Sequence, residues 1–126
     1  MKEGGLQILI LDDEPIVGRR LRAALEKNGH AVEVFEDSRA ALERLAEREF
    51  DIVVTDVRME EIDGIQVLER VLERSGRTKV IVITGYATVE VAREALAKGA
   101  FDFIAKPFKP DDLRQVIAKA AAALNP

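Results

Sequence analysis

Three acids, a hydroxyl and an ammonium follow or end four apolar runs in this chain. Asp12 and Asp13 follow LQILIL, Asp56 closes DIVVTD, Thr84 closes KVIVIT and Lys106 closes DFIAK. Continuous apolar runs of this length are typical of buried parallel strands. In an open parallel sheet, the functional crevice lies outside the carboxyl ends of the strands. We therefore expect these five side chains to meet at one edge of a sheet.

The residue types in this set favour a hard divalent cation and a phosphoryl group. Three neighbouring carboxylates repel one another and raise one another's pKa values unless a cation lies between them. Mg²⁺ prefers carboxylate, water and phosphate oxygens, and the absence of histidine from the set makes zinc and copper poor fits. Lys106 adds a point charge for a phosphoryl oxygen and Thr84 adds a hydroxyl donor. These are the parts needed for phosphoryl transfer to one remaining carboxylate, Asp56.

Strand and helix patterns alternate along the chain to position those residues. Strands are expected at 6–12, 31–35, 52–56, 79–84 and 102–106. Helices are expected at 14–28, from Asp37 or Ser38 onward, at 65–75, at 89–96 and at 110–124, and Gly29 and Gly99 stop the first and fourth. A loop after Asp56 is expected to turn at Asp63-Gly64. Five alternating pairs predict an α/β fold with helices on both faces of a parallel sheet, in the flavodoxin-like strand order 2-1-3-4-5.

Composition narrows the class of protein. The 126 residues are 48% hydrophobic and include no cysteine, so we expect one domain over 1–126 with no disulfide and no thiolate metal site. No apolar run reaches the length of a membrane span, and MKEGG lacks the core of a signal peptide, so we expect a cytoplasmic protein. The net charge of −4, with mixed signs, argues against direct binding to nucleic acid.

Over essentially its whole length the chain resembles the receiver domain of a two-component response regulator. The resemblance lies in four motifs in the family's order: the acidic pair in LILDDEP, Asp56 at the end of the third strand, Thr84 in ITGYA, and Lys106-Pro107 in DFIAKPF. It implies that Asp56 is the phosphoacceptor. It also implies that Asp13, Asp56 and the backbone carbonyl of Arg58 contact Mg²⁺, with Asp12 acting mostly through water, and that the Lys106-Pro107 peptide is cis.

The same resemblance implies a conformational switch. Thr84 would move toward the phosphoryl group and Phe103 would swing into the space that Thr84 leaves, although Phe103 is also expected to be a half-buried core residue. This movement would repack the surface formed by the helix at 89–96, the strand at 102–106 and the helix at 110–124. The domain would catalyse its own aspartyl phosphorylation and dephosphorylation, and is better described as a switch than as an enzyme with a separate substrate.

Two positions of the motifs bear on how long the phosphoryl group lasts. Arg58 and Tyr86 lie two residues after the acceptor and two after the threonine, where the family tunes this lifetime. A long and a bulky side chain there would shield the acyl phosphate from water, so we predict dephosphorylation over many minutes or longer. Glu60 follows Met59 where many members have proline, which would loosen the loop and add negative charge near the site.

The resemblance also predicts partners. The phosphoryl group would come from a sensor histidine kinase, a phosphotransfer protein or a small phosphodonor. Residues 84–108 resemble receivers attached to transcriptional activators of the nitrogen-regulation type, so an output domain is one expected partner. A homodimer through the surface of 89–96, 102–106 and 110–124 is another.

Other readings of the same residues stay open at this point. A flavin-binding electron carrier would need a Ser/Thr/Gly-rich loop where this chain has the charged DDEP, and Tyr86 is its only obvious stacking residue. A magnesium-dependent phosphatase would carry a second acid where Arg58 stands, and a cap insertion. A receiver that no longer phosphorylates would serve only as a docking module. His30, the only histidine, is expected to face solvent, outside any phosphohistidine relay.

Overall fold

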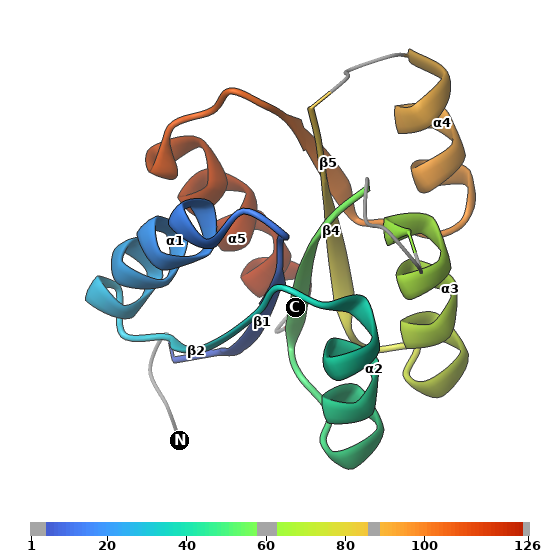
Figure 1. The fold of residues 1–126 in the computed structure, drawn as a ribbon, viewed down its shortest axis with the longest axis horizontal. Helices are drawn as coiled ribbons and strands as arrows, with labels where there is room; N and C mark the ends of the chain where they lie inside the picture. Colours follow the sequence, from blue (N-terminus) through green and yellow to red (C-terminus); the bar gives the residue numbers. More distant parts are fainter. Residues whose placement is uncertain (1–4, 58–62, 86–88, 125–126) are drawn as a thin grey trace.

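The computed structural model describes residues 5–57, 63–85 and 89–124, and strands alternate with helices along them (Figure 1). The strands are β1 (Gln7–Leu11), β2 (Ala31–Phe35), β3 (Ile52–Asp56), β4 (Lys79–Thr84) and β5 (Asp102–Ala105). The helices are α1 (Pro15–Lys27), α2 (Ser38–Glu47), α3 (Gly64–Arg74), α4 (Val89–Ala97) and α5 (Pro110–Leu124). No helix within these residues has both the length and the apolar character needed to cross a membrane.

The strands form one parallel sheet in the order β2-β1-β3-β4-β5, which confirms the predicted topology. Helices α1 and α5 lie over one face and α2, α3 and α4 over the other (Figure 1). Because all strands run the same way, β1, β3, β4 and β5 end at one edge of the sheet. Asp12, Asp56, Thr84 and Lys106 stand at those ends.

The core consists of two apolar layers, one on each face of the sheet. Successive residues of a strand point to opposite faces, so Ile8 and Ile10 of β1 pack toward α1 and α5, whereas Leu9 and Leu11 pack toward the other helices. All four side chains are fully buried. Burial on both faces explains why the central strands read as unbroken apolar runs.

Local sequence signals set the helix ends. Pro15 occupies the first turn of α1, where its missing N–H has no partner to lose. Asp37, rather than Ser38, caps α2 by accepting from the amides of Arg39 and Ala40. Gly29 has a φ of 89° just beyond α1, a conformation that glycine adopts without steric cost.

The start of α3 differs from the expected turn at Asp63-Gly64. Asp63 is instead the N-cap of the helix and Gly64 its first residue. The Asp63 side chain accepts from the amide of Gln66 at 2.9 Å, and the Gln66 side chain accepts from the amide of Asp63 at 3.0 Å. This reciprocal pair is a capping box. Because Asp-Gly is also a common turn sequence, the helix start was mistaken for a turn.

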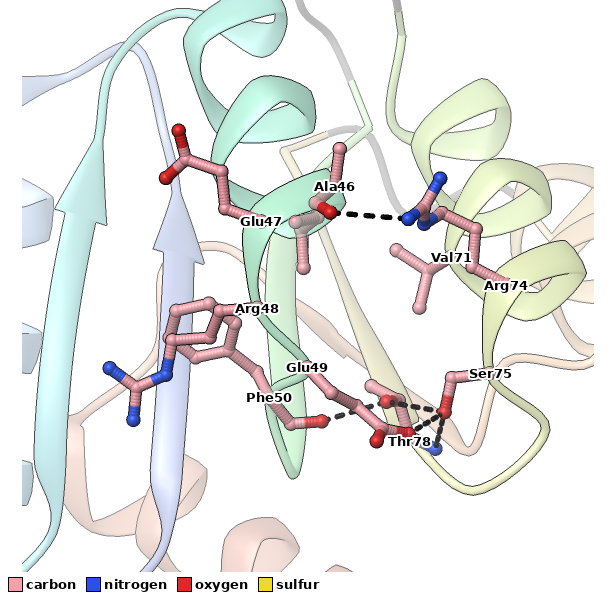
Figure 2. Close-up of a pocket in the computed structure, with 10 residues that line it drawn as sticks. Ala46, Glu47, Arg48, Glu49, Phe50, Val71, Arg74, Ser75 and Thr78 are labelled. Atoms are coloured by element: carbon pink, nitrogen blue, oxygen red, sulfur yellow. Dashed lines mark hydrogen bonds between the residues drawn. The ribbon is translucent and has the colours of Figure 1, made fainter.

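A polar cluster fastens the amino ends of β3 and β4, at the edge opposite Asp56. The hydroxyl of buried Thr78 donates to the carbonyl of Phe50 at 2.7 Å, and Ser75 bonds Glu49 (Figure 2). Figure 2 also shows a small pocket between the ends of α2 and α3, crossed by a hydrogen bond from Arg74 to the carbonyl of Ala46.

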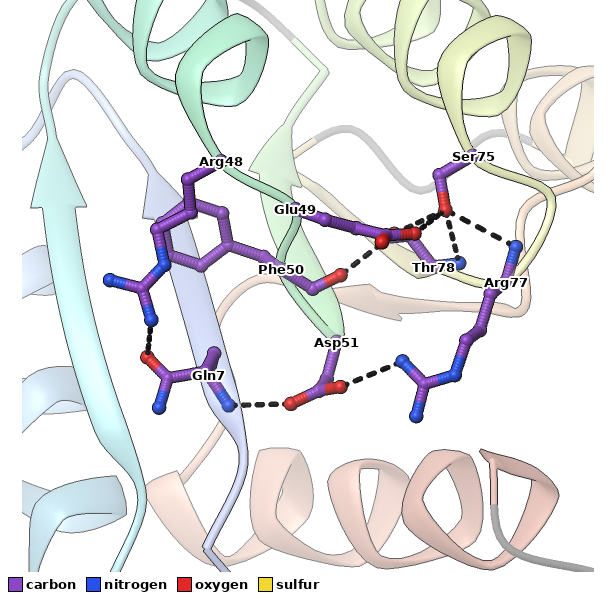
Figure 3. Close-up of polar contacts among 8 residues, drawn as sticks. All are labelled: Gln7, Arg48, Glu49, Phe50, Asp51, Ser75, Arg77 and Thr78. Carbon is purple, nitrogen blue, oxygen red and sulfur yellow. Dashed lines mark hydrogen bonds and ion pairs between the residues drawn. The ribbon is translucent and has the colours of Figure 1, made fainter.

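Asp51 extends this cluster toward β1. Its carboxylate accepts from the amide of Gln7 at 2.8 Å and pairs with Arg77 at 2.9 Å (Figure 3). Arg48 bonds the Gln7 side chain and lies over the ring of Phe50, 5.2 Å from its centroid. These contacts join β1 to the connections that lead into β3 and β4. They therefore hold the amino ends of these strands, and the acids lie at the carboxyl ends of β1 and β3.

His30 does not face solvent as expected. It is half-buried, and its Nδ1 accepts a hydrogen bond from the amide of Leu6 at 3.1 Å. Burial lowers the pKa of this imidazole below its ordinary value, since the charged form is poorly solvated there. The ring must be neutral at Nδ1 to accept from Leu6, so protonation removes this contact.

We expect the free energy of unfolding to fall as the pH drops below about 6.5. The pKa of His30 is lower in the folded chain, so the unfolded chain takes up the proton first. The loss begins near the unfolded pKa and ends below the folded pKa, with a slope of at most about 1.4 kcal/mol per pH unit. Urea unfolding between about pH 7 and 5.5 measures it, and His30→Asn, which keeps an acceptor, serves as the control. Equal slopes for both chains would contradict this role.

Candidate functional site

Three carboxylates meet at the carboxyl edge of the sheet. Each of Asp12, Asp13 and Asp56 offers one oxygen, and these three oxygens all lie within 4.8 Å of one another. Asp12 is fully buried and Asp56 is 5% exposed, whereas Asp13 is open to solvent. Two of these acids are thus held in a poorly solvated place, where their charges need a nearby cation.

Lys106 supplies one cation from the end of β5. Its Nζ lies 2.9 Å from Oδ2 of Asp56, 3.1 Å from Oδ2 of Asp12 and 2.7 Å from Oε1 of Glu14. The lysine is positioned by its own backbone, because its amide donates to the carbonyl of Thr84 at 2.8 Å. Strands β4 and β5 therefore bring a point positive charge directly onto Asp56.

Burial and ion pairing shift the pKa values of this cluster in opposite directions. Burial alone would lower the pKa of Lys106, but its hydrogen bonds to Glu14 and Asp56 and the charge of Asp12 raise it well above its ordinary value. Burial raises the pKa of Asp12, although a bond from the amide of Glu14 and the charge of Lys106 counteract the rise. The hydrogen bond to Lys106 lowers the pKa of Glu14. Lys106 is therefore charged at neutral pH.

The cluster leaves one buried acceptor unsatisfied, and this observation tests whether a metal fits. Oδ1 of Asp12 accepts from the amide of Glu14 at 2.9 Å. Oδ2 has no hydrogen-bond partner within the described residues, although the charge of Lys106 is nearby. An unsatisfied carboxylate oxygen among two further carboxylates is the donor set that Mg²⁺ prefers, so the residues fit that ion.

Among the other predicted site residues that the structure describes, Thr84 and Pro107 adjoin Lys106, and Phe103 lies three residues before it. Thr84 is buried at the end of β4, and the Lys106-Pro107 peptide is cis. Phe103 lies in β5 opposite Val82 of β4 and is partly buried against the layer of α2, α3 and α4. Arg58 and Tyr86, together with Met59 and Glu60, lie outside the described residues.

Two features of the site were not predicted from the sequence. Glu14 follows the acidic pair and turns its side chain to Lys106 instead of capping α1. Gly64 packs its backbone directly against the end of β3, and its amide donates to the carbonyl of Val57 at 2.9 Å. The third acid of DDEP gives no sign of its partner, which lies 92 residues away, and a close backbone approach leaves no mark in the sequence beyond the glycine itself.

Gly64→Ala is expected to destabilise the chain by about 1–3 kcal/mol and to slow chemistry at Asp56. An added Cβ would lie 2.8 Å from Cα of Val57 and closer still to the carbonyl oxygen of Asp56, so α3 or the end of β3 must shift. Urea unfolding measures the loss. Gly76→Ala is the matched control, because nothing lies within 4 Å of its added Cβ, and it should change stability by less than about 0.5 kcal/mol. Equal effects of the two changes would refute the close approach.

A family model described as the response regulator receiver domain matches residues 8–118. The chain belongs to the response regulator receiver family. This confirms the resemblance that the four motifs carried, and receiver domains as a family accept phosphoryl groups in signalling.

Solved receiver domains share the fold of this one. The beryllofluoride-activated NtrC4 receiver domain dimer is 33% identical, with a TM-score of 0.89 over 94% of this chain and 98% of that one. NtrX from Brucella abortus, solved in complex with ATP, is 30% identical, with a TM-score of 0.88 over 94% of this chain and 27% of that one.

Curated relatives of the receiver domain are regulators of greater length. Regulatory protein AtoC of Escherichia coli K12 is 42% identical over 114 residues, which are 90% of this chain and 25% of AtoC. Transcriptional regulatory protein ZraR of the same strain is 38% identical over 97% of this chain and 28% of its own length. The chain therefore spans roughly a quarter of these relatives, and matches them over nearly all of its own length.

Proposed function

We propose that this receiver domain is a phosphorylation-dependent switch that accepts a phosphoryl group on Asp56. The observation that carries the proposal is the contact between Lys106 and Asp56 beside two further carboxylates, Asp12 and Asp13. Asp56 is the member of the set that ends its strand and accepts a hydrogen bond from the lysine. A docking module with no chemistry would have no need to hold an ammonium against buried acids.

The proposed reaction transfers a phosphoryl group without any redox change. A carboxylate oxygen of Asp56 attacks phosphorus, and the bond from phosphorus to a histidine nitrogen, or to the acetate oxygen of acetyl phosphate, breaks. The bonding electrons leave with that nitrogen or oxygen. Lys106 is already 2.9 Å from the nucleophilic carboxylate and would pair with the incoming phosphoryl oxygens, and the Thr84 hydroxyl would donate to one of them.

Mg²⁺ would be held by the carboxylates of Asp13 and Asp56 and the backbone carbonyl of Arg58, with Asp12 acting through water. When bound, the ion neutralises charge on the phosphoryl oxygens and brings them close to the acceptor carboxylate. The buried, unsatisfied Oδ2 of Asp12 supports this assignment, because a hydrated cation would satisfy it.

The proposed output is a change in packing on the α4-β5-α5 surface. Thr84 would move to the phosphoryl group, and the half-buried Phe103 would turn into the space beside it, so that β5 and the flanking helices repack. A sensor histidine kinase or phosphotransfer protein would supply the phosphoryl group. An output domain, as in the longer relatives, or a second copy of the chain would read the new surface. Arg58 and Tyr86 would set the lifetime of the phosphorylated state at many minutes or longer.

Intact-mass spectrometry after incubation with acetyl phosphate tests the proposal. The wild-type chain should gain one phosphoryl mass with Mg²⁺ and none in excess chelator. Asp56→Asn, which keeps the shape but not the nucleophile, should gain none under either condition. A folded wild-type chain that gains no mass with Mg²⁺ would favour the docking-only alternative.

A further inference from the structure

Glu14 occupies the N-cap position of α1 but does not cap the helix. Its backbone is extended, and its side chain accepts no hydrogen bond from the amides of the first turn. N-cap side chains commonly accept from the amides of that turn. Here Oε1 of Glu14 accepts instead from Nζ of Lys106 at 2.7 Å, the shortest of the three carboxylate contacts that the lysine makes within the described residues.

The three carboxylates around Lys106 differ in the free energy needed to break their contact with the lysine. Asp12 has a fully buried side chain, so losing the lysine would leave a charge without solvent. Asp56 is the acceptor of the proposed reaction. The Glu14 side chain is 61% exposed, and water can replace the lysine there at little cost.

Lys106 donates hydrogen bonds to Glu14 and Asp56, and Oδ2 of Asp12 lies 3.1 Å from the same ammonium group without a hydrogen bond. A phosphoryl group on Asp56 would compete with these carboxylates for the ammonium group. Because its side chain is the most exposed of the three, Glu14 is the carboxylate that loses its contact with Lys106.

We propose that Glu14 is a positioning residue that holds Lys106 in the unphosphorylated receiver and is displaced from it when a phosphoryl group arrives. This inference rests on the proposed function and adds a residue that regulates the rate of phosphorylation. Glu14 stabilises the state before transfer and makes no contact with the lysine afterwards. It therefore slows phosphorylation of Asp56 without affecting hydrolysis of the product.

The isosteric change Glu14→Gln separates these two steps. With acetyl phosphate and saturating Mg²⁺, the rate constant for gain of the phosphoryl mass should rise about two- to fivefold, the range expected for an ion pair with one exposed partner. After removal of the phosphodonor, the rate constant for loss of that mass should match that of the wild type. A general disturbance of the site would change both rate constants.

Glu36→Gln is the matched control for charge. Glu36 is an exposed acid just beyond β2, whose last residue, Phe35, accepts from the amide of Asp12 at 3.0 Å. The change therefore removes one negative charge at the same edge of the sheet, outside the carboxylates that contact Lys106. It should leave the rate of phosphorylation near that of the wild type.

The outcomes distinguish the two levels of the proposal. Faster phosphorylation of Glu14→Gln alone, with unchanged hydrolysis, supports the displaced contact. An unchanged rate, an equal acceleration in Glu36→Gln, or parallel changes in both steps would overturn it while leaving the receiver function intact. A wild-type chain that is never phosphorylated would overturn the proposed function, and this inference with it.

Discussion

Lys106→Met is expected to lower the free energy of unfolding by about 2 kcal/mol at neutral pH without metal. Methionine keeps much of the side-chain volume but removes the ammonium group that lies 3.1 Å from Asp12 and 2.9 Å from Asp56. A buried carboxylate without a partner is costly, and the 20% exposure of the lysine side chain makes the loss smaller than for a fully buried pair. The rate of Asp56 phosphorylation should also fall by about a hundredfold, because one preorganised donor to the phosphoryl oxygens is gone.

Urea unfolding in chelator measures the stability change, and a second variant identifies its cause. Asp12→Asn in the Lys106→Met background removes the unpaired buried charge, so it should recover most of the lost stability but none of the lost phosphorylation. If Lys106→Met is as stable as the wild type, or if the second change recovers nothing, the ion pairs do not hold this edge together.

Mg²⁺ is expected to stabilise the wild-type chain by about 2.7 kcal/mol when its concentration is a hundred times its dissociation constant. Asp13→Asn should abolish this stabilisation, because it removes an exposed carboxylate of the cluster. The same variant should be more stable than the wild type in chelator, since it relieves repulsion among three acids within 4.8 Å.

Thermal unfolding with and without Mg²⁺ measures both effects. Added KCl at the ionic strength of the magnesium salt controls for screening of surface charge. Stabilisation by KCl equal to that by Mg²⁺, or an unchanged response of Asp13→Asn to the ion, would show that the acids do not form a metal site.

The strand order and the meeting of the acids with Lys106 were predictable from local patterns. Apolar runs such as KVIVIT indicate strands that are buried on both faces. Their alternation with helices then predicts parallel strands whose carboxyl ends lie at one edge of the sheet. Once the order was known, Asp12, Asp56 and Lys106 had to come together.

Contacts that depend on tertiary packing were not predictable in this way. His30 looked like a solvated turn residue, because nothing near it in sequence shows that the amide of Leu6 donates to its ring. Asp63-Gly64 looked like a turn, because a capping box and a turn use the same residues. Glu14 carries no local sign of its bond to Lys106, which lies 92 residues away along the chain.

The central claim is that Asp56 itself becomes the acyl phosphate. The most direct test is to treat the chain with acetyl phosphate and Mg²⁺, reduce it with borohydride, which converts an aspartyl phosphate to homoserine, and map the peptides by mass spectrometry. We predict homoserine at position 56 and unchanged aspartate at positions 12 and 13. Reduction at Asp12 or Asp13, or at no aspartate in a folded chain, would contradict this account of the site.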